Sequence, residues 1–188
     1  VESTERLFNI CKYITKEFDK GNKVIVVVSA QGKTTDNLIK EAKEINEDID
    51  KRELDVLISV GEQITISKLA MCLKKLGYDA ISLTGWQIPI KTNDNYGDAD
   101  ILNINLDRII NELNNKRIVI IAGFQGINEK YNDITTLGRG GSDTTAVAVA
   151  SALKADKCDI YKDVDGIYNI DPKTNEKAIM IFKRHALY

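Results

Sequence analysis

The residues best suited to chemistry lie in a glycine-rich loop, Gly138–Asp143, that opens into an apolar helical pattern. Three of its first four residues are glycine, and Arg139 stands between them. Glycine lets the backbone approach a ligand closely, and amides at a helix N-terminus attract anions. The arginine fork suits a carboxylate or a phosphate. The loop therefore predicts a ligand site, with Ser142 or Asp143 as helix N-cap, because a plain glycine turn would not require the arginine.

A second polar loop, residues 29–36, follows a run of β-branched residues. Its Gly32-Lys33-Thr34 triplet resembles the end of a P-loop, but the leading glycine of that motif would fall on Val27 inside the run, which argues against a P-loop NTPase. Two interpretations remain open. The loop is either a strand-to-helix turn capped by Thr35 or the aspartate after it, or a site where Ser29 and Thr35 offer hydroxyls to a small polar substrate.

Carboxylates at two further places could face a ligand. Asp163 and Asp165 lie in a third loop, with a glycine next. They could serve a magnesium ion on nucleotide phosphates, which needs one or two protein oxygens, or cap a tight turn. Glu62 follows Gly61 inside a long helical pattern, and a carboxylate at such a glycine break can face a ligand rather than solvent.

Histidine and cysteine contribute little to the expected chemistry. The single histidine, His185, lies close to the end of the sequence, which argues against a Ser-His-Asp triad or an HExxH metal motif. Cys11, Cys72 and Cys158 are odd in number and widely separated, so we expect buried reduced thiols rather than zinc or disulfides. We assign no metal-ligating residues. The chemistry must use Lys, Arg, Asp, Glu, hydroxyls and backbone amides.

Alternating helices and strands must position these loops. Apolar spacing predicts helices over 7–18, 36–45, 54–76 (broken near residue 61), 105–113 and 142–153. Continuous apolar runs predict buried strands over 23–30 and 117–122, and residues 79–84 and 159–161 are also strand-like. This alternation predicts an α/β fold with a mostly parallel sheet covered by helices on both faces. Such sheets bind ligands at the carboxyl ends of their strands, where the polar loops fall.

Composition narrows the function classes. The 188 residues are 43% hydrophobic and 29% charged, as in ordinary globular domains. A net charge of -2 argues against a broad nucleic-acid-binding surface. The longest apolar run, Val24–Val28, is far shorter than the roughly 18 residues that span a bilayer, and the first residues do not resemble a signal peptide. We therefore expect a cytoplasmic protein that binds neither nucleic acid nor membrane.

The stretch from Gly138 to Asp171, beginning GRGGSDTTAVAVA, resembles the catalytic domain of the aspartate kinases, within the amino acid kinase family. Supporting stretches are residues 26–38, the Gly61-Glu62 pair and residues 122–128, in the family's order and at its spacing. The resemblance implies a three-layer α/β/α sandwich and transfer of the ATP γ-phosphoryl group, with Mg²⁺, to the side-chain carboxylate of L-aspartate. That reaction is the first step toward lysine, threonine and methionine. Family analogy also implies a homodimer.

The resemblance also implies roles for individual residues. Glu62 would take the amino group of aspartate, and Arg139 and Ser142 would hold its carboxylates. The implied substrate-binding set is Ser29, Thr35, Glu62, Arg139, Gly140, Gly141 and Ser142, and the implied catalytic set is Arg139, Ser142 and Asp143. The implied nucleotide-binding set is Lys162, Asp163, Tyr168 and Lys173.

The sequence departs from the family pattern near its ends. Family members open with a strand and a Lys-x-Gly-Gly-[Thr/Ser]-Ser loop whose lysine stabilises the transferring phosphoryl group, and Val1–Ser3 align just after that loop. Residues 178–188 do not resemble the family, and no regulatory ACT domain is present. We therefore expect a catalytic domain over 1–177, incomplete at both ends. Lys162 stands where Ser or Thr is usual, and Lys173 where Arg is common.

Two alternatives to an aspartate kinase stay open. One is a family member that acts on another carboxylate, such as an acylated glutamate. The other is a truncated, catalytically inactive chain that binds aspartate or nucleotide or serves as an interaction module.

Overall fold

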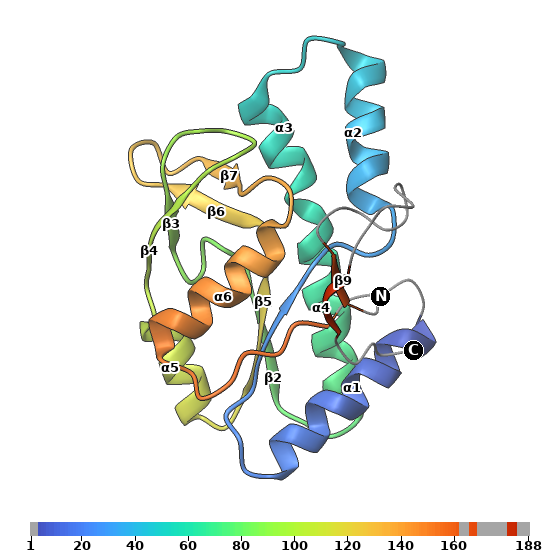
Figure 1. The fold of residues 1–188 in the computed structure, drawn as a ribbon, viewed down its shortest axis with the longest axis vertical. Helices are drawn as coiled ribbons and strands as arrows, with labels where there is room; N and C mark the ends of the chain where they lie inside the picture. The colour runs from blue at the N-terminus through green and yellow to red at the C-terminus, as the bar shows by residue number, and fades with distance from the viewer. Residues whose placement is uncertain (1–3, 162–165, 169–179, 184–188) are drawn as a thin grey trace. The chain divides into compact units, whose positions relative to one another are not determined.

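The computed structural model describes residues 4–161 with their side chains, and the backbone of residues 166–168 and 180–183. The chain forms two compact units, Val1–Asp156 and Lys157–Tyr188. In the second unit, β8 (Gly166–Tyr168) pairs antiparallel with β9 (Met180–Lys183). Every element that positions the candidate site described below belongs to the first unit (Figure 1).

The first unit is built around a parallel sheet of three strands in the order β1-β5-β2. They are β1 (Ile25–Val28), β5 (Ile118–Ala122) and β2 (Ala80–Leu83). All three were predicted as strands, β1 and β5 from continuous apolar runs, and every residue of β5 is fully buried. The register pairs Val28 with Ala122, so β1 and β5 end side by side.

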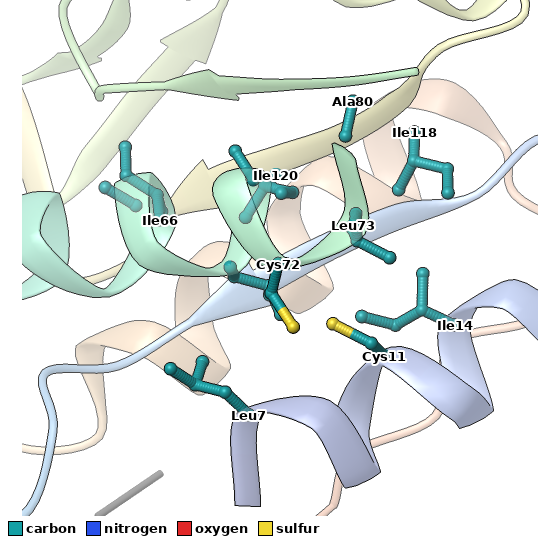
Figure 2. Close-up of a cluster of buried hydrophobic side chains, with 12 residues drawn as sticks. Leu7, Cys11, Ile14, Ile66, Cys72, Leu73, Ala80, Ile118 and Ile120 are labelled. Atoms are coloured by element: carbon teal, nitrogen blue, oxygen red, sulfur yellow. The ribbon is translucent and has the colours of Figure 1, made fainter. Parts of the chain in front are cut away.

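Helices cover both faces of this sheet, which confirms the three-layer α/β/α arrangement. On one face, α1 (Thr4–Asp19) and α4 (Val60–Lys75) pack over Ile118 and Ile120 through apolar residues such as Leu7 and Leu73 (Figures 1 and 2). On the other, Val119 and Ile121 meet residues of α5 (Asp107–Asn114) and α6 (Gly141–Leu153). The alternation of β5 side chains between the two clusters follows from the period of a strand.

The core also contains two of the three cysteines. Cys11 on α1 and Cys72 on α4 are buried, and their sulfur atoms point toward one another (Figure 2). Burial, reinforced by Cys72, raises the pKa of the Cys11 thiol to about 12, so this thiol stays protonated and unreactive at neutral pH. The prediction of buried thiols is therefore confirmed for these two, whereas Cys158 is exposed, contrary to that prediction.

A second, mixed sheet was not predicted from the sequence. Its strand order is β4-β3-β6-β7, comprising β3 (Ile90–Thr92), β4 (Ile101–Ile104), β6 (Gln125–Asn128) and β7 (Ile134–Thr136). The pairs β3–β4 and β6–β7 are antiparallel, and β3–β6 is parallel. These strands are only three or four residues long, and β3, β6 and β7 carry buried polar side chains, so they lack the apolar pattern of a strand. The strand predicted over 159–161 is wrong, because those residues are irregular.

The long helical pattern predicted over 54–76 is two helices, α3 (Lys51–Ile58) and α4, interrupted at Ser59 rather than at Gly61. By length and composition alone, the Lys51–Lys75 stretch could cross a membrane. More than half of its most apolar part is buried inside the protein, where Leu69 and Leu73 pack in the core, as expected of a core helix.

The predicted helix caps are wrong. Helix α2 (Thr34–Ile45) begins one residue before Thr35, with Lys33 at its N-cap. Helix α6 begins after Gly140, whose φ of 79° is left-handed, and no side chain of the described residues caps it. Instead the Gly140 carbonyl accepts the backbone N–H groups of Asp143 and Thr144, at 3.0 and 3.1 Å. The backbone turn itself starts this helix, so Ser142 is not consumed as a cap.

Candidate active site

Two of the three predicted ligand loops meet where β1 and β5 end. The Gly123 N–H donates to the Val28 carbonyl at 3.0 Å, so the residues after both strands lie at one edge of the sheet. A Cβ on Gly123 would fall 2.7 Å from the Cβ of Ser142, closer than real Cβ atoms come. Glycine at position 123 therefore allows the start of α6 to rest against the end of β5. The Ser29 loop and the Gly138–Ser142 turn are thus brought to the same edge.

Glu62 reaches this edge from the first turn of α4. Its side chain is 3% exposed, and its Oε1 accepts the backbone N–H of Ala30 at 2.8 Å. The other oxygen, Oε2, is buried and has no hydrogen-bond partner among the described residues. Gly61 lets α4 approach so closely, because a Cβ there would lie 2.7 Å from the Ala30 Cβ and 3.6 Å from the Thr35 Oγ1.

The pKa of Glu62 is that of a buried carboxylate with one oxygen that lacks a hydrogen-bond partner among the described residues. Burial raises the pKa of Glu62 from 4.5 to about 7, and the hydrogen bond from Ala30 offsets only part of this effect. A buried carboxylate with one unpaired oxygen lowers the stability of the fold unless another group donates a hydrogen bond to that oxygen. A ligand ammonium group would do so, because it carries both the hydrogen atoms and the compensating charge.

Arg139 lies in the exposed part of the turn that precedes α6. Its neighbours Gly138 and Gly140 have φ values of +68° and +79°, a left-handed backbone that glycine adopts without strain. Arg139 is exposed, whereas Gly141 is buried and Ser142 and Asp143 are half-buried. A permanently charged guanidinium group thus stands beside the start of a helix, where the helix dipole also favours an anion.

The other predicted substrate residues lie on the Ser29–Asp36 loop. Ser29 is exposed, and Thr35 is half-buried in the first turn of α2. Thr34 closes the turn by donating to the Gln31 carbonyl at 2.6 Å. Sequence analysis missed Lys68 of α4, whose Nζ donates to the Gln31 side chain at 2.8 Å and brings a further cation to this loop. No local sequence pattern marks Lys68 as a site residue, because most lysines on helices are simply solvated.

The nucleotide-binding residues remain a prediction. Lys162, Asp163 and Lys173 lie outside the described residues, as does Asp165. Tyr168 ends β8, of which the backbone alone is described. Among the described residues, no group of three or more His, Cys, Asp or Glu side chains could hold a metal ion.

A buried aspartate behind the site was also missed. Asp55 on α3 is fully buried, and its Oδ2 accepts the backbone N–H groups of Gly97 and Thr136, each at 2.9 Å. Its Oδ1 accepts the Thr136 hydroxyl at 2.7 Å. Burial raises the pKa of Asp55, and these hydrogen bonds oppose the rise. Asp55 therefore ties α3 to the end of β7, just before the turn that carries Arg139.

The chain is an α/β domain whose polar loops gather at the carboxyl ends of parallel strands, which is where such sheets bind ligands. A model of the amino acid kinase family matches residues 1–184, and the chain belongs to this family. The match runs past residue 177, where the catalytic domain was expected to end, and the boundary itself stays a prediction.

The chain is similar to several aspartokinases. It is 56% identical over 178 residues to an aspartokinase of Bacillus sp. (strain MGA3) and 53% identical to aspartokinase 2 of Bacillus subtilis (strain 168). Each alignment covers 95% of this chain, and the chain spans only about 43% of the length of these curated relatives.

The chain is also similar to solved structures of aspartate kinases. The crystal structure of aspartate kinase from Synechocystis matches with a TM-score of 0.77 and 44% identity, over 95% of this chain and 29% of that one. E. coli aspartokinase III in complex with aspartate and ADP matches with a TM-score of 0.73 and 25% identity, over 90% of this chain and 50% of that one. These similarities confirm the resemblance and the fold expected from the sequence.

Proposed function

We propose that the protein acts as an aspartate kinase, which transfers the γ-phosphoryl group of ATP to the side-chain carboxylate of L-aspartate and gives 4-phospho-L-aspartate. The observation that carries the proposal is the buried, unpartnered Oε2 of Glu62 at the edge where Ser142 meets Gly123. An amino acid has an ammonium group to fill that position and carboxylates for Arg139. The names of the relatives, and the aspartate and ADP in the E. coli complex, support the same substrates.

In this proposal, the residues of the site bind and orient the substrate rather than attack it. Glu62 holds the ammonium group, and Arg139 and Ser142 hold the carboxylates, with Gly140 and Gly141 allowing close approach. A side-chain carboxylate oxygen then forms the bond to the γ-phosphorus as the bond to ADP breaks. Such a transfer depends on positioning and charge stabilisation, so a site without histidine is adequate.

Thr35 and Ser29 line the same edge and would complete the substrate contacts, while Asp143 would act beside Ser142 at the reacting carboxylate. Lys162, Asp163, Tyr168 and Lys173 would hold the nucleotide. Mg²⁺ would enter with the nucleotide phosphates, which leaves one or two coordination positions to protein oxygens. A cytoplasmic homodimer in lysine, threonine and methionine synthesis belongs to the same proposal.

Trapping with hydroxylamine tests this reaction. The chain, supplied with ATP, Mg²⁺ and L-aspartate, should form aspartyl hydroxamate, because hydroxylamine intercepts the acyl phosphate. Hydroxamate formed from N-acetylglutamate but not from aspartate would contradict the proposal and favour the family member with another substrate. Aspartate binding measured by calorimetry, without any hydroxamate, would favour the inactive binding chain.

Replacing Arg139 should separate the two substrates. Arg139→Ala is expected to raise the Kd for aspartate by about a hundredfold or more, because it leaves a substrate carboxylate without its charged partner. Binding of ADP should stay within about twofold, since Arg139 stands on the substrate side in this proposal. Arg139→Lys is the matched variant, because it keeps the charge but loses the planar guanidinium group. Its Kd for aspartate should lie between those of the unaltered chain and Arg139→Ala. Calorimetric titrations with each ligand measure this, and an equal loss of both ligands would contradict the role.

A further inference from the structure

Gln125 is a buried polar residue that the proposed mechanism does not use. It is the first residue of β6, and it is fully buried. Its Nε2 donates to the Ser59 carbonyl at 2.8 Å, and its Oε1 accepts the Gly85 N–H at 3.1 Å. Both ends of one amide are thus used, and they join β6 to the α3–α4 junction and to the segment that follows β2.

The bond to Ser59 lies where the long helix is interrupted. Ser59 separates α3 from α4, and its hydroxyl donates to the Val56 carbonyl at 2.8 Å. Ser59 itself is fully buried, and as the N-cap of α4 its carbonyl also accepts the first backbone hydrogen bond of that helix, so a side-chain amide adds a second donor. Gln125 supplies that donor at 2.8 Å, whereas the Gln63 side chain approaches the same oxygen only to 3.4 Å. Gln125 therefore ties the start of α4 to the first residue of β6.

The same junction sets the position of Glu62. Ser59 and Glu62 are three residues apart, so they lie on the same side of the helix, about one turn from each other. Gln125 in turn follows Gly123 by two residues, through a tight turn in which its N–H donates to the Gly123 carbonyl at 2.8 Å. Phe124, within this turn, has a φ of 66°, a strained conformation for a residue with a side chain. One short segment thus touches Ser142 through Gly123 and holds the helix of Glu62 through Gln125.

We propose that Gln125 is a positioning residue, which holds the Glu62 carboxylate in register with the Gly123–Ser142 contact so that one substrate meets both. The inference rests on the proposed function, in which Glu62 binds the ammonium group of aspartate. It adds a residue that contacts neither substrate but determines the distance between the two groups that do.

Gln125→Met tests this role, because methionine has a similar length and volume but makes neither hydrogen bond. The Kd for aspartate should rise about tenfold or more, since small displacements of a binding group cost affinity, while the Kd for ADP stays within about twofold. Gln87→Met is the matched control. Gln87 bonds to Thr84, in the same segment as Gly85 but away from Ser59, and its replacement should leave both affinities unchanged.

Gln125→Glu provides a second measurement should the methionine variant fold poorly. A neutral carboxyl can donate to the Ser59 carbonyl and accept from Gly85, whereas the ionised form cannot donate. The loss of aspartate affinity relative to the unaltered chain should therefore be larger at about pH 8 than at about pH 6, and the comparison at equal pH cancels the titration of Glu62. A loss that does not change with pH would contradict the donor role.

Glu62→Gln in the same titrations separates the two proposals. If it abolishes aspartate binding while the folded Gln125→Met variant binds aspartate normally, the positioning role is wrong and the proposed function stands. If Glu62→Gln binds aspartate normally, or the unaltered chain does not bind it, the proposed function is wrong and the positioning role with it. Equal losses of aspartate and ADP in Gln125→Met would also overturn the inference, because they indicate general loosening of the fold.

Discussion

Asp55→Ala is expected to destabilise the folded chain by about 3 kcal/mol, because three donors, two of them buried, lose their acceptor at once. Those donors are the N–H groups of Gly97 and Thr136 and the Thr136 hydroxyl. Urea denaturation followed by circular dichroism measures the change as a lower transition midpoint. The effect should spread to the Arg139 turn, which begins directly after β7, so aspartate binding should weaken even in buffer where the variant is folded.

Asp55→Asn is the matched control for this experiment. An asparagine oxygen at the Oδ2 position can accept both N–H groups, and its NH₂ can donate to the Thr136 hydroxyl. We therefore expect a loss of about 1 kcal/mol, the usual contribution of one hydrogen bond. If the two variants lower the free energy of unfolding by the same amount, then the buried charge of Asp55, rather than its hydrogen bonds, stabilises the fold. An alanine variant as stable as the unaltered chain would mean that Asp55 does not hold the turn.

Glu62→Gln is expected to abolish aspartate binding and yet to stabilise the chain at neutral and higher pH. The pKa of Glu62 is about 7 in the folded chain, against 4.5 for an ordinary glutamate, so the folded state holds the proton more tightly. The stability that this group contributes is full below about pH 4.5 and is lost as pH rises to about 7. The total loss is roughly 3 kcal/mol, which the variant recovers in part because it carries no charge.

Urea denaturation at a series of pH values from about 5 to 8.5 measures the difference in unfolding free energy between Glu62→Gln and the unaltered chain. This difference should grow toward pH 7 and then level off. Glu112→Gln is the matched control, since Glu112 is also buried but hydrogen bonds from Arg117 and Arg108 lower its pKa. Its replacement should destabilise the chain at neutral pH. A Glu62→Gln variant that is less stable than the unaltered chain at pH 8 would contradict the unpartnered state of the carboxylate.

The sequence predicted the parts of the fold that depend on local pattern. β5 is a continuous apolar run and could be found directly, as could Glu62, because a carboxylate beside Gly61 breaks the ordinary helical pattern. Ser59 marks the helix interruption only two residues from the predicted place. Cap positions were not predictable in this way, because the backbone of Gly140 takes the role that a side chain usually has.

The buried polar residues could not be predicted, because their partners are distant in sequence. Asp55 lies within an amphipathic helical pattern where an aspartate is normally solvated, and its partner Thr136 is 81 residues away. Gln125 reaches Ser59 across 66 residues. Short strands such as β6 have no pattern of their own, so the sheet that brings these pairs together leaves no local signal either.

The pairing of Val28 with Ala122 joins segments that lie far apart along the chain. Neither the Ser29 loop nor the Gly138–Ser142 turn carries the site by itself, because Gly123 and Glu62 set the spacing between them. The candidate site therefore forms only when β1 and β5 are paired. A fluctuation that separates these two strands separates the loops of the site, even while each loop keeps its local structure. Under the proposed function, an amino acid that binds at this edge would stabilise the β1–β5 pairing, because it binds only the state in which both loops are in place.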